Sequence, residues 1–210
     1  MKRHRTIVYV DGFNFYYGAL KGTNWKWLDV PALFQNVLGP ENEIVRVKYF
    51  TAKVQPTSTD PDVSARQEIY LRALGEYCPL VEVFFGHFLR HCVRMEHATP
   101  PPNTVPVWKN EEKGSDVNLA LHLLNDAWQN AYDCAVVVSN DSDLAEALRL
   151  VRAQHRKLIG LITPGAPLRK TSWQLRRHSH FVKPIRSWAL QASQLPDPIP
   201  GTALRKPANW

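Results

Sequence analysis

The run CAVVVSNDSDL at residues 134–144 decides the expected fold. Its first five residues are apolar without interruption, which is typical of a strand at the centre of a parallel sheet covered on both faces. Asp141 and Asp143 follow this strand directly, and residues 143–152 then repeat apolar side chains at helical spacing. A strand, a polar turn and a helix in this order form the repeating unit of an α/β domain.

The same alternation of strands and helices continues on both sides of this run. A β-branched and aromatic stretch at residues 6–10 ends at Asp11-Gly12 and is expected to form another buried strand. Further strands are expected at residues 43–50, 80–85, 87–95, 157–162 and 180–185, and helices at residues 13–20, 61–77 and 168–177. This order predicts an α/β fold with a mostly parallel sheet.

Residues 115–130 form the clearest expected helix. Its apolar residues recur at intervals of three and four, so we expect one face to pack against the sheet. That face consists of Val117, Ala120, Leu121, Leu124, Ala127 and Trp128.

Proline-rich segments mark the expected irregular parts of the chain. Four prolines between residues 98 and 107 predict a loop there. Several more prolines after residue 195 predict a flexible tail. We therefore expect one domain at residues 1–187 and a Pro-rich C-terminal tail at residues 188–210.

Composition excludes several classes of protein. Apolar residues make up 44% of the 210 residues, and seven are tryptophan, which excludes wholesale disorder. No apolar run approaches the roughly 20 residues that a membrane-spanning helix needs, so no membrane partner is expected. The three cysteines are odd in number and lack paired spacing, which favours a reducing compartment, and we expect a cytoplasmic protein.

The net charge of +7 is concentrated in two places. Lys2, Arg3 and Arg5 lie at the N-terminus, and residues 163–186 contain six lysines and arginines without any acidic residue. The remainder of the chain is mildly acidic. A basic patch beside acidic groups suits a phosphate-rich partner, although solvated surface charge would produce the same pattern.

Four aspartates lie where the expected strands end or the expected helices begin: Asp11, Asp116, Asp141 and Asp143. The carboxyl ends of parallel strands share one edge of a sheet, so these side chains are expected to converge. Carboxylates at close range repel unless cations lie between them, and hard oxygen ligands select Mg²⁺ or Mn²⁺. Each aspartate taken alone is equally typical of a turn or a helix cap.

The ordered set of motifs resembles a known family. VDGFN at residues 10–14 resembles the opening DGxN motif of NYN domains, which are relatives of PIN-domain nucleases. YFTA at 49–52, EKGSDV at 112–117 and SNDSDL at 139–144 resemble further motifs of the LabA-like branch, in the same order. Two positions depart from its pattern, because Asn140 replaces the usual glycine and Leu144 the usual phenylalanine. The resemblance covers residues 5–186.

The resemblance implies a PIN-like three-layer α/β/α sandwich and hydrolysis of RNA with Mg²⁺ or Mn²⁺ as cofactor. Carried over motif by motif, it implies the catalytic residues Asp11, Asn14, Asp116, Asp141 and Asp143, with the four aspartates as metal ligands. Asn14 would orient Asp11 or a water, or it would only cap a helix. The expected products carry 5′-phosphate and 3′-hydroxyl ends.

A basic set of residues is expected to hold single-stranded or structured RNA. It consists of Lys113, Arg169, Lys170, Arg176 and Arg177. Trp173 and His178 could stack on bases, but core packing is the favoured interpretation of Trp173, because tryptophan is usually largely buried.

Other functions remain open at this point. A non-catalytic RNA-binding or scaffold protein would keep the fold, and a DNA-directed nuclease would use the same acidic residues. A homo-oligomer is compatible with the sequence. Zinc binding by His87, His91, Cys92 and His97 is not favoured, because their spacing matches no common zinc finger.

Overall fold

Six parallel strands form the central sheet, in the order β3-β2-β1-β6-β7-β8. The computed structural model that shows this describes residues 3–165, 170–208 and 210. The strands are β1 His4–Asp11, β2 Asn42–Thr51, β3 Val81–Phe85, β6 Cys134–Val138, β7 Leu158–Thr163 and β8 Phe181–Pro184. The predicted α/β fold with a mostly parallel sheet is confirmed.

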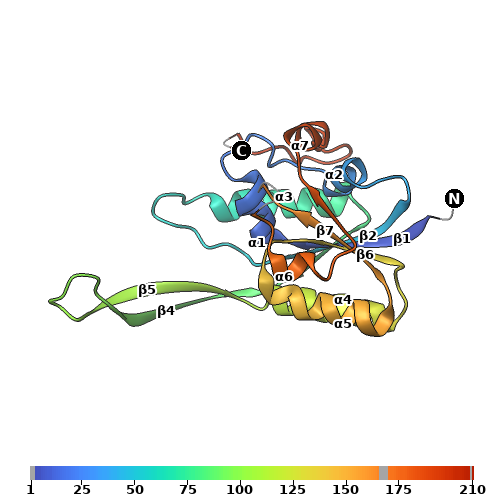
Figure 1. Cartoon of the computed structure of the whole chain (residues 1–210). Helices are drawn as coiled ribbons and strands as arrows, with labels where there is room; N and C mark the ends of the chain where they lie inside the picture. The colour runs from blue at the N-terminus through green and yellow to red at the C-terminus, as the bar shows by residue number, and fades with distance from the viewer. Residues whose placement is uncertain (1–2, 166–169, 209) are drawn as a thin grey trace.

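Helices cover both faces of this sheet and make three layers (Figure 1). On one face lie α2 Val30–Val37, α3 Val63–Tyr77 and α7 Ser187–Ala192. On the other face lie α4 Ser115–Trp128, α5 Ala145–His155 and α6 Trp173–Arg176. Strand β6 is buried at all five residues, because its alternate side chains enter the two apolar layers.

Two short helical segments follow strand ends at the carboxyl edge of the sheet. After β1 the chain forms α1 Gly12–Phe15 and then a π-helical turn, η1 Tyr16–Leu20. After β6 it forms the 3₁₀ turn η2 Ser142–Leu144, which leads into α5. Because β1 and β6 are neighbours, these two turns lie side by side.

A two-stranded antiparallel ribbon projects from the body of the domain (Figure 1). It consists of β4 His87–Glu96 and β5 Thr104–Lys113. The predicted loop at residues 98–107 was therefore wrong in its second half, since β5 begins at Thr104 and includes Pro106. Each strand of a two-stranded ribbon has only one partner and therefore a free outer edge. A proline whose nitrogen faces that edge removes no hydrogen bond between the strands.

Helix α4 packs with a different face from the predicted one. Leu119, Leu123 and Ala127 point into the core, whereas Val117 and Leu121, expected inside, are exposed. The cause is Asp126, which lies inward and accepts hydrogen bonds from the Lys48 ammonium at 2.6 Å and the Tyr9 hydroxyl at 2.7 Å.

The C-terminal segment packs against the domain, which differs from the predicted flexible tail. Leu195 and Ile199 are buried, and the Trp27 indole donates a hydrogen bond to the Pro196 carbonyl at 3.0 Å. The ring of Trp210 lies 5.2 Å from that of Tyr70, centroid to centroid.

Among the described residues, no helix is long and apolar enough to cross a bilayer.

Candidate active site

Asp11 occupies the carboxyl end of β1 and is 4% exposed. One carboxylate oxygen accepts a hydrogen bond from the backbone N–H of Asn14 at 2.9 Å, which caps α1. The other accepts a hydrogen bond from the Ser139 hydroxyl at 2.8 Å. Two donors, one in α1 after β1 and one directly after β6, therefore fix the orientation of this carboxylate.

Ser139 connects Asp11 to the aspartates that follow β6. Its hydroxyl oxygen also accepts a hydrogen bond from the backbone N–H of Asp141 at 3.0 Å. The Asp141 carboxylate in turn accepts one from the backbone N–H of Asp143, also at 3.0 Å, and so caps the turn η2. The sequence did not single out Ser139, although it lies within the SNDSDL motif.

Asn14 and Asn140 link three separate segments of the chain. The side-chain amide oxygen (Oδ1) of Asn14 accepts a hydrogen bond from the backbone N–H of Asn140 at 3.0 Å. The side chain of Asn140 contacts residues 170–172, accepting from the Ser172 N–H at 2.7 Å and donating to the Lys170 carbonyl at 3.2 Å. The asparagine at position 140 thus attaches the basic segment to the acidic edge of the sheet.

Asp116 and Glu112 approach this edge from the base of the projecting ribbon. Asp116 lies in the first turn of α4, which begins after Gly114 at a φ of 96°. Glu112, at the end of β5, accepts hydrogen bonds from the Ser115 hydroxyl at 2.8 Å and the Ser115 N–H at 3.2 Å. A Cβ at Gly86 would collide with the Lys113 backbone carbonyl oxygen as well as with the Glu112 carboxylate, so only glycine fits there. Sequence reasoning missed Glu112 as a site residue.

These carboxylates influence one another electrostatically. Burial, followed by the negative charges of Asp11, Asp141, Glu112 and Asp143, raises the pKa of Asp116 to about 6. Burial also raises the pKa of Asp11, and the charges of Asp141 and Glu112 add to this, while the donors Asn14 and Ser139 oppose it. The structure therefore places all four aspartates predicted from the sequence at one edge of the sheet, where their charges act on Asp116, and Glu112 is a fifth acidic group there.

The donor set matches a hard divalent cation in its chemistry. Crowded carboxylate oxygens are the preferred ligands of Mg²⁺ and Mn²⁺, and a cation would relieve the repulsion that raises the pKa of Asp116. Among the described residues, no three His, Cys, Asp or Glu side chains already stand close enough to hold an ion. These side chains could hold a divalent ion only after moving closer together.

Four of the five predicted nucleic-acid-binding residues lie in the described part of the chain. Lys113 is exposed and pairs with Glu111 at 3.0 Å. Lys170, Arg176 and Arg177 are exposed, whereas Arg169 lies outside the described residues.

The favoured core packing of Trp173 was wrong, because this side chain is 66% exposed. Helix α6 has only four residues and buries Leu175, so Trp173 remains on the outside. The guanidinium of Arg177 lies over the indole, 4.8 Å from the ring centroid.

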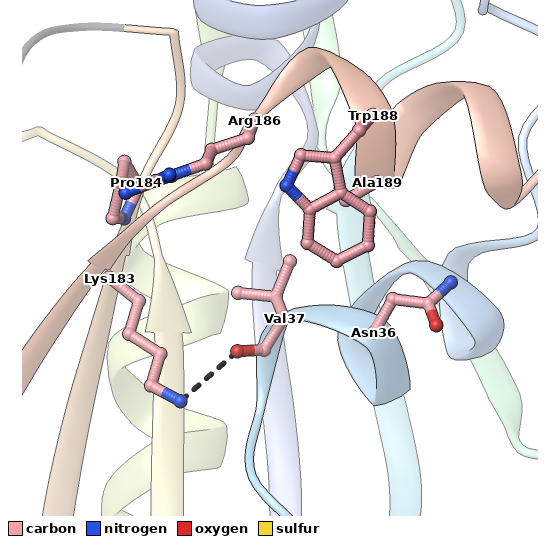
Figure 2. A pocket seen from close by; sticks show the side chains of 7 residues that line it. All are labelled: Asn36, Val37, Lys183, Pro184, Arg186, Trp188 and Ala189. Atoms are coloured by element: carbon pink, nitrogen blue, oxygen red, sulfur yellow. Dashed lines mark hydrogen bonds between the residues drawn. The ribbon is translucent and has the colours of Figure 1, made fainter.

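A shallow pocket of about 200 Å³ lies away from the acidic edge, between α2, β8 and α7. Figure 2 shows the Trp188 indole beside Val37, with the Lys183 ammonium donating a hydrogen bond to the Val37 carbonyl at 3.1 Å. Arg186 adds a second cationic side chain to the lining. An indole and two cations are groups that can hold a flat molecule bearing a carboxylate.

Comparison with known proteins identifies a family, a curated relative and a similar solved structure. The NYN domain family model matches residues 5–185. The chain is 35% identical over 234 residues to 6-hydroxy-3-succinoylpyridine 3-monooxygenase HspA of Pseudomonas putida, covering 98% of this chain and 75% of that protein. A crystal structure of a protein of unknown function from Vibrio parahaemolyticus matches with a TM-score of 0.55 and 19% identity, covering 88% of this chain and 94% of the other. The structural likeness supports the fold alone, and the LabA-like branch stays a prediction.

Proposed function

We propose that this chain, which belongs to the NYN domain family, is a metal-dependent nuclease that hydrolyses RNA. The observation that carries the proposal is the crowding of carboxylates at the carboxyl edge of the sheet, where the pKa of Asp116 is raised to about 6. A protein that only bound RNA would gain nothing from negative charges gathered beside a polyanion. A nuclease needs them to hold cations against the scissile phosphate.

Asp11, Asp116, Asp141 and Asp143 would hold Mg²⁺ or Mn²⁺. When bound, such an ion lowers the pKa of a water and neutralises charge on the phosphodiester. Ser139 contributes by fixing the Asp11 carboxylate and the backbone of Asp141, since its hydroxyl donates to the Asp11 carboxylate and accepts from the Asp141 N–H. The Asn14 side chain holds α1 against residue 140, so the segments that follow β1 and β6 stay together.

The RNA strand would be held by α6 and the segment before it. The Trp173 indole is exposed and backed by the Arg177 guanidinium, a combination that can stack on a base and contact a phosphate. Lys170 is attached to the acidic edge through Asn140. Cations next to the acidic edge would offset the repulsion between its carboxylates and the approaching strand.

The test is cleavage of labelled single-stranded RNA and DNA by chelator-treated protein with Mn²⁺ or Mg²⁺ added back. We expect cleavage of RNA that requires the metal and leaves 5′-phosphate ends. Asp141→Asn should abolish it, whereas Asp133→Asn, which removes a surface carboxylate paired with Arg5, should retain it. Full activity of Asp141→Asn would overturn the metal-ligand assignment. If only DNA is cleaved, the proposed nuclease chemistry stands, but the substrate is DNA and not RNA.

A second candidate function comes from the relative in Pseudomonas putida, whose name describes a monooxygenase acting on 6-hydroxy-3-succinoylpyridine. The identity extends over 98% of this chain, and the pocket with Trp188, Lys183 and Arg186 offers an indole and two cations. A monooxygenase inserts one atom of O₂ into its substrate and reduces the other to water with electrons from a donor.

This second function is tested by incubating the protein with 6-hydroxy-3-succinoylpyridine, NADH and air, and by following substrate and product by chromatography. Turnover that is lost in Arg186→Gln but kept in Asp141→Asn would favour the monooxygenase over the nuclease. Absence of turnover, together with metal-dependent RNA cleavage, would leave the nuclease as the function.

A further inference from the structure

Helix α4 carries an apolar stripe on its outer surface. Val117, Leu121 and Trp128 are 62%, 59% and 72% exposed, and the partly exposed Leu124 lies between them. These four residues are separated by four, three and four positions, so they fall within one narrow strip of the helix surface. The Trp128 ring meets that of His155 on α5 edge to face at 4.6 Å, but most of its surface stays exposed, and no described segment of the chain covers the stripe.

The stripe lacks the charges that a surface helix normally displays. The charged residues of α4 are Asp116, at the acidic edge, and Asp126, which is buried against Lys48. The helix has no lysine or arginine at all. Without cations it does not suit RNA or an anionic membrane, and without outward charges it does not repel a second copy of itself.

The spacing of the stripe is complementary to itself. When two copies of a helix pack antiparallel about a two-fold axis, each residue of one copy faces one residue of the other. The two residue numbers of every facing pair add up to the same total. With the axis between His122 and Leu123, Val117 faces Trp128 of the second copy, and Leu121 faces Leu124. A small side chain meets the largest one, and two leucines of equal size meet each other, which permits close packing.

We propose that two copies of this chain associate through the outer face of α4, packed antiparallel. This inference rests on the fold and the exposed stripe, and it is independent of the nuclease proposal. The three most exposed side chains offer roughly 400 Å² per copy, about half of a standard protein interface, so the dimer is concentration-dependent and includes the edges of neighbouring elements. The second copy would place its Trp128 beside Val117, one residue from Asp116.

The first test is sedimentation of the full chain across a wide range of concentrations. We expect a monomer–dimer equilibrium in the unmodified protein. Leu121→Glu would place two carboxylates in the centre of the interface and should raise the dissociation constant at least about tenfold, while leaving the melting temperature unchanged because the site is exposed. Gln35→Glu, which adds the same charge on the exposed surface of α2 on the opposite face of the sheet, should not change it.

A second test reports the antiparallel register directly. In a Cys92→Ser background, which removes the exposed cysteine, Leu121→Cys and Leu124→Cys proteins are mixed and oxidised. We expect rapid disulfide formation between the two, and slow self-coupling of Val117→Cys, whose copies lie far apart in this arrangement. A monomer at every concentration, a Leu121→Glu protein that remains dimeric, or faster coupling of Val117→Cys would overturn the proposal.

Discussion

Replacing Asp116 by asparagine should make the metal-free protein more stable at about pH 7.5 while abolishing its nuclease activity. The pKa of this carboxyl is raised to about 6 by burial and by the neighbouring acids. The folded state therefore holds a proton more tightly than the unfolded chain, whose aspartate titrates near about 3.9. The charged side chain destabilises the fold above about pH 6, and this cost disappears below about pH 4.

The size of the effect follows from these two values. A difference of about 2 pKa units corresponds to about 2.8 kcal/mol. Because Asp116 is partly exposed, solvent screening reduces this to about 1.5 kcal/mol. Asparagine also loses about 0.5 kcal/mol of favourable interaction with the N-terminus of α4. The net gain is about 1 kcal/mol, or a rise of about 2–4 °C in melting temperature for a chain of this size.

The assay is thermal unfolding of both proteins in chelator between about pH 4 and pH 8, with the curves expected to converge at the acidic end. Asp133→Asn is the control of opposite sign. The hydrogen bond and charge of Arg5 lower the pKa of Asp133 to about 2, so its replacement should reduce stability slightly at neutral pH. Added Mn²⁺ should stabilise the unmodified protein more than Asp116→Asn. A variant that is less stable than the unmodified protein throughout would refute the crowding of carboxylates.

Three further predictions concern other contacts. Asp126→Asn should lower the free energy of unfolding in urea by about 3 kcal/mol, because it leaves the buried Lys48 ammonium without its partner; a loss under about 1 kcal/mol would mean that this lysine reaches water. Ser139→Ala should weaken Mn²⁺ binding about tenfold in calorimetry, and unchanged affinity would contradict its positioning role. Arg177→Gln should weaken RNA binding in anisotropy titrations. It should also make the slope of the logarithm of the binding constant against the logarithm of the salt concentration shallower by about one. An unchanged slope would place the RNA elsewhere.

The sheet and the acidic edge could be predicted because their signals are local. An uninterrupted apolar run at 134–138 is sufficient to identify a central strand, and the rule that parallel strands end at one edge brings Asp11 near Asp141. Glu112 was not recognised because it reaches the edge from β5, a strand that was not predicted: residues 104–107 were expected to form a loop, and the residues that follow were assigned to no strand.

The orientation of α4 could not be predicted because it depends on a distant partner. Apolar residues surround most of this helix, so periodicity alone allows more than one inward face. Asp126 decides between them by pairing with Lys48, 78 positions earlier in the chain. The packing of the C-terminal segment also depends on distant partners. Trp210 contacts Tyr70 and Trp27, and no local sequence pattern indicates these contacts.

The projecting ribbon should open at a lower free-energy cost than the central sheet of the same chain. Strands β4 and β5 form a sheet of their own, and at its base the ring of Phe88 meets Phe13 edge to face at 5.7 Å. A lone two-stranded ribbon is marginally stable in water, so its backbone amides should exchange with deuterium through local opening. The amides of β1 and β6, buried between two layers of helices, should exchange only when the whole domain unfolds. The ribbon can thus bend and refold many times during the life of a single intact domain.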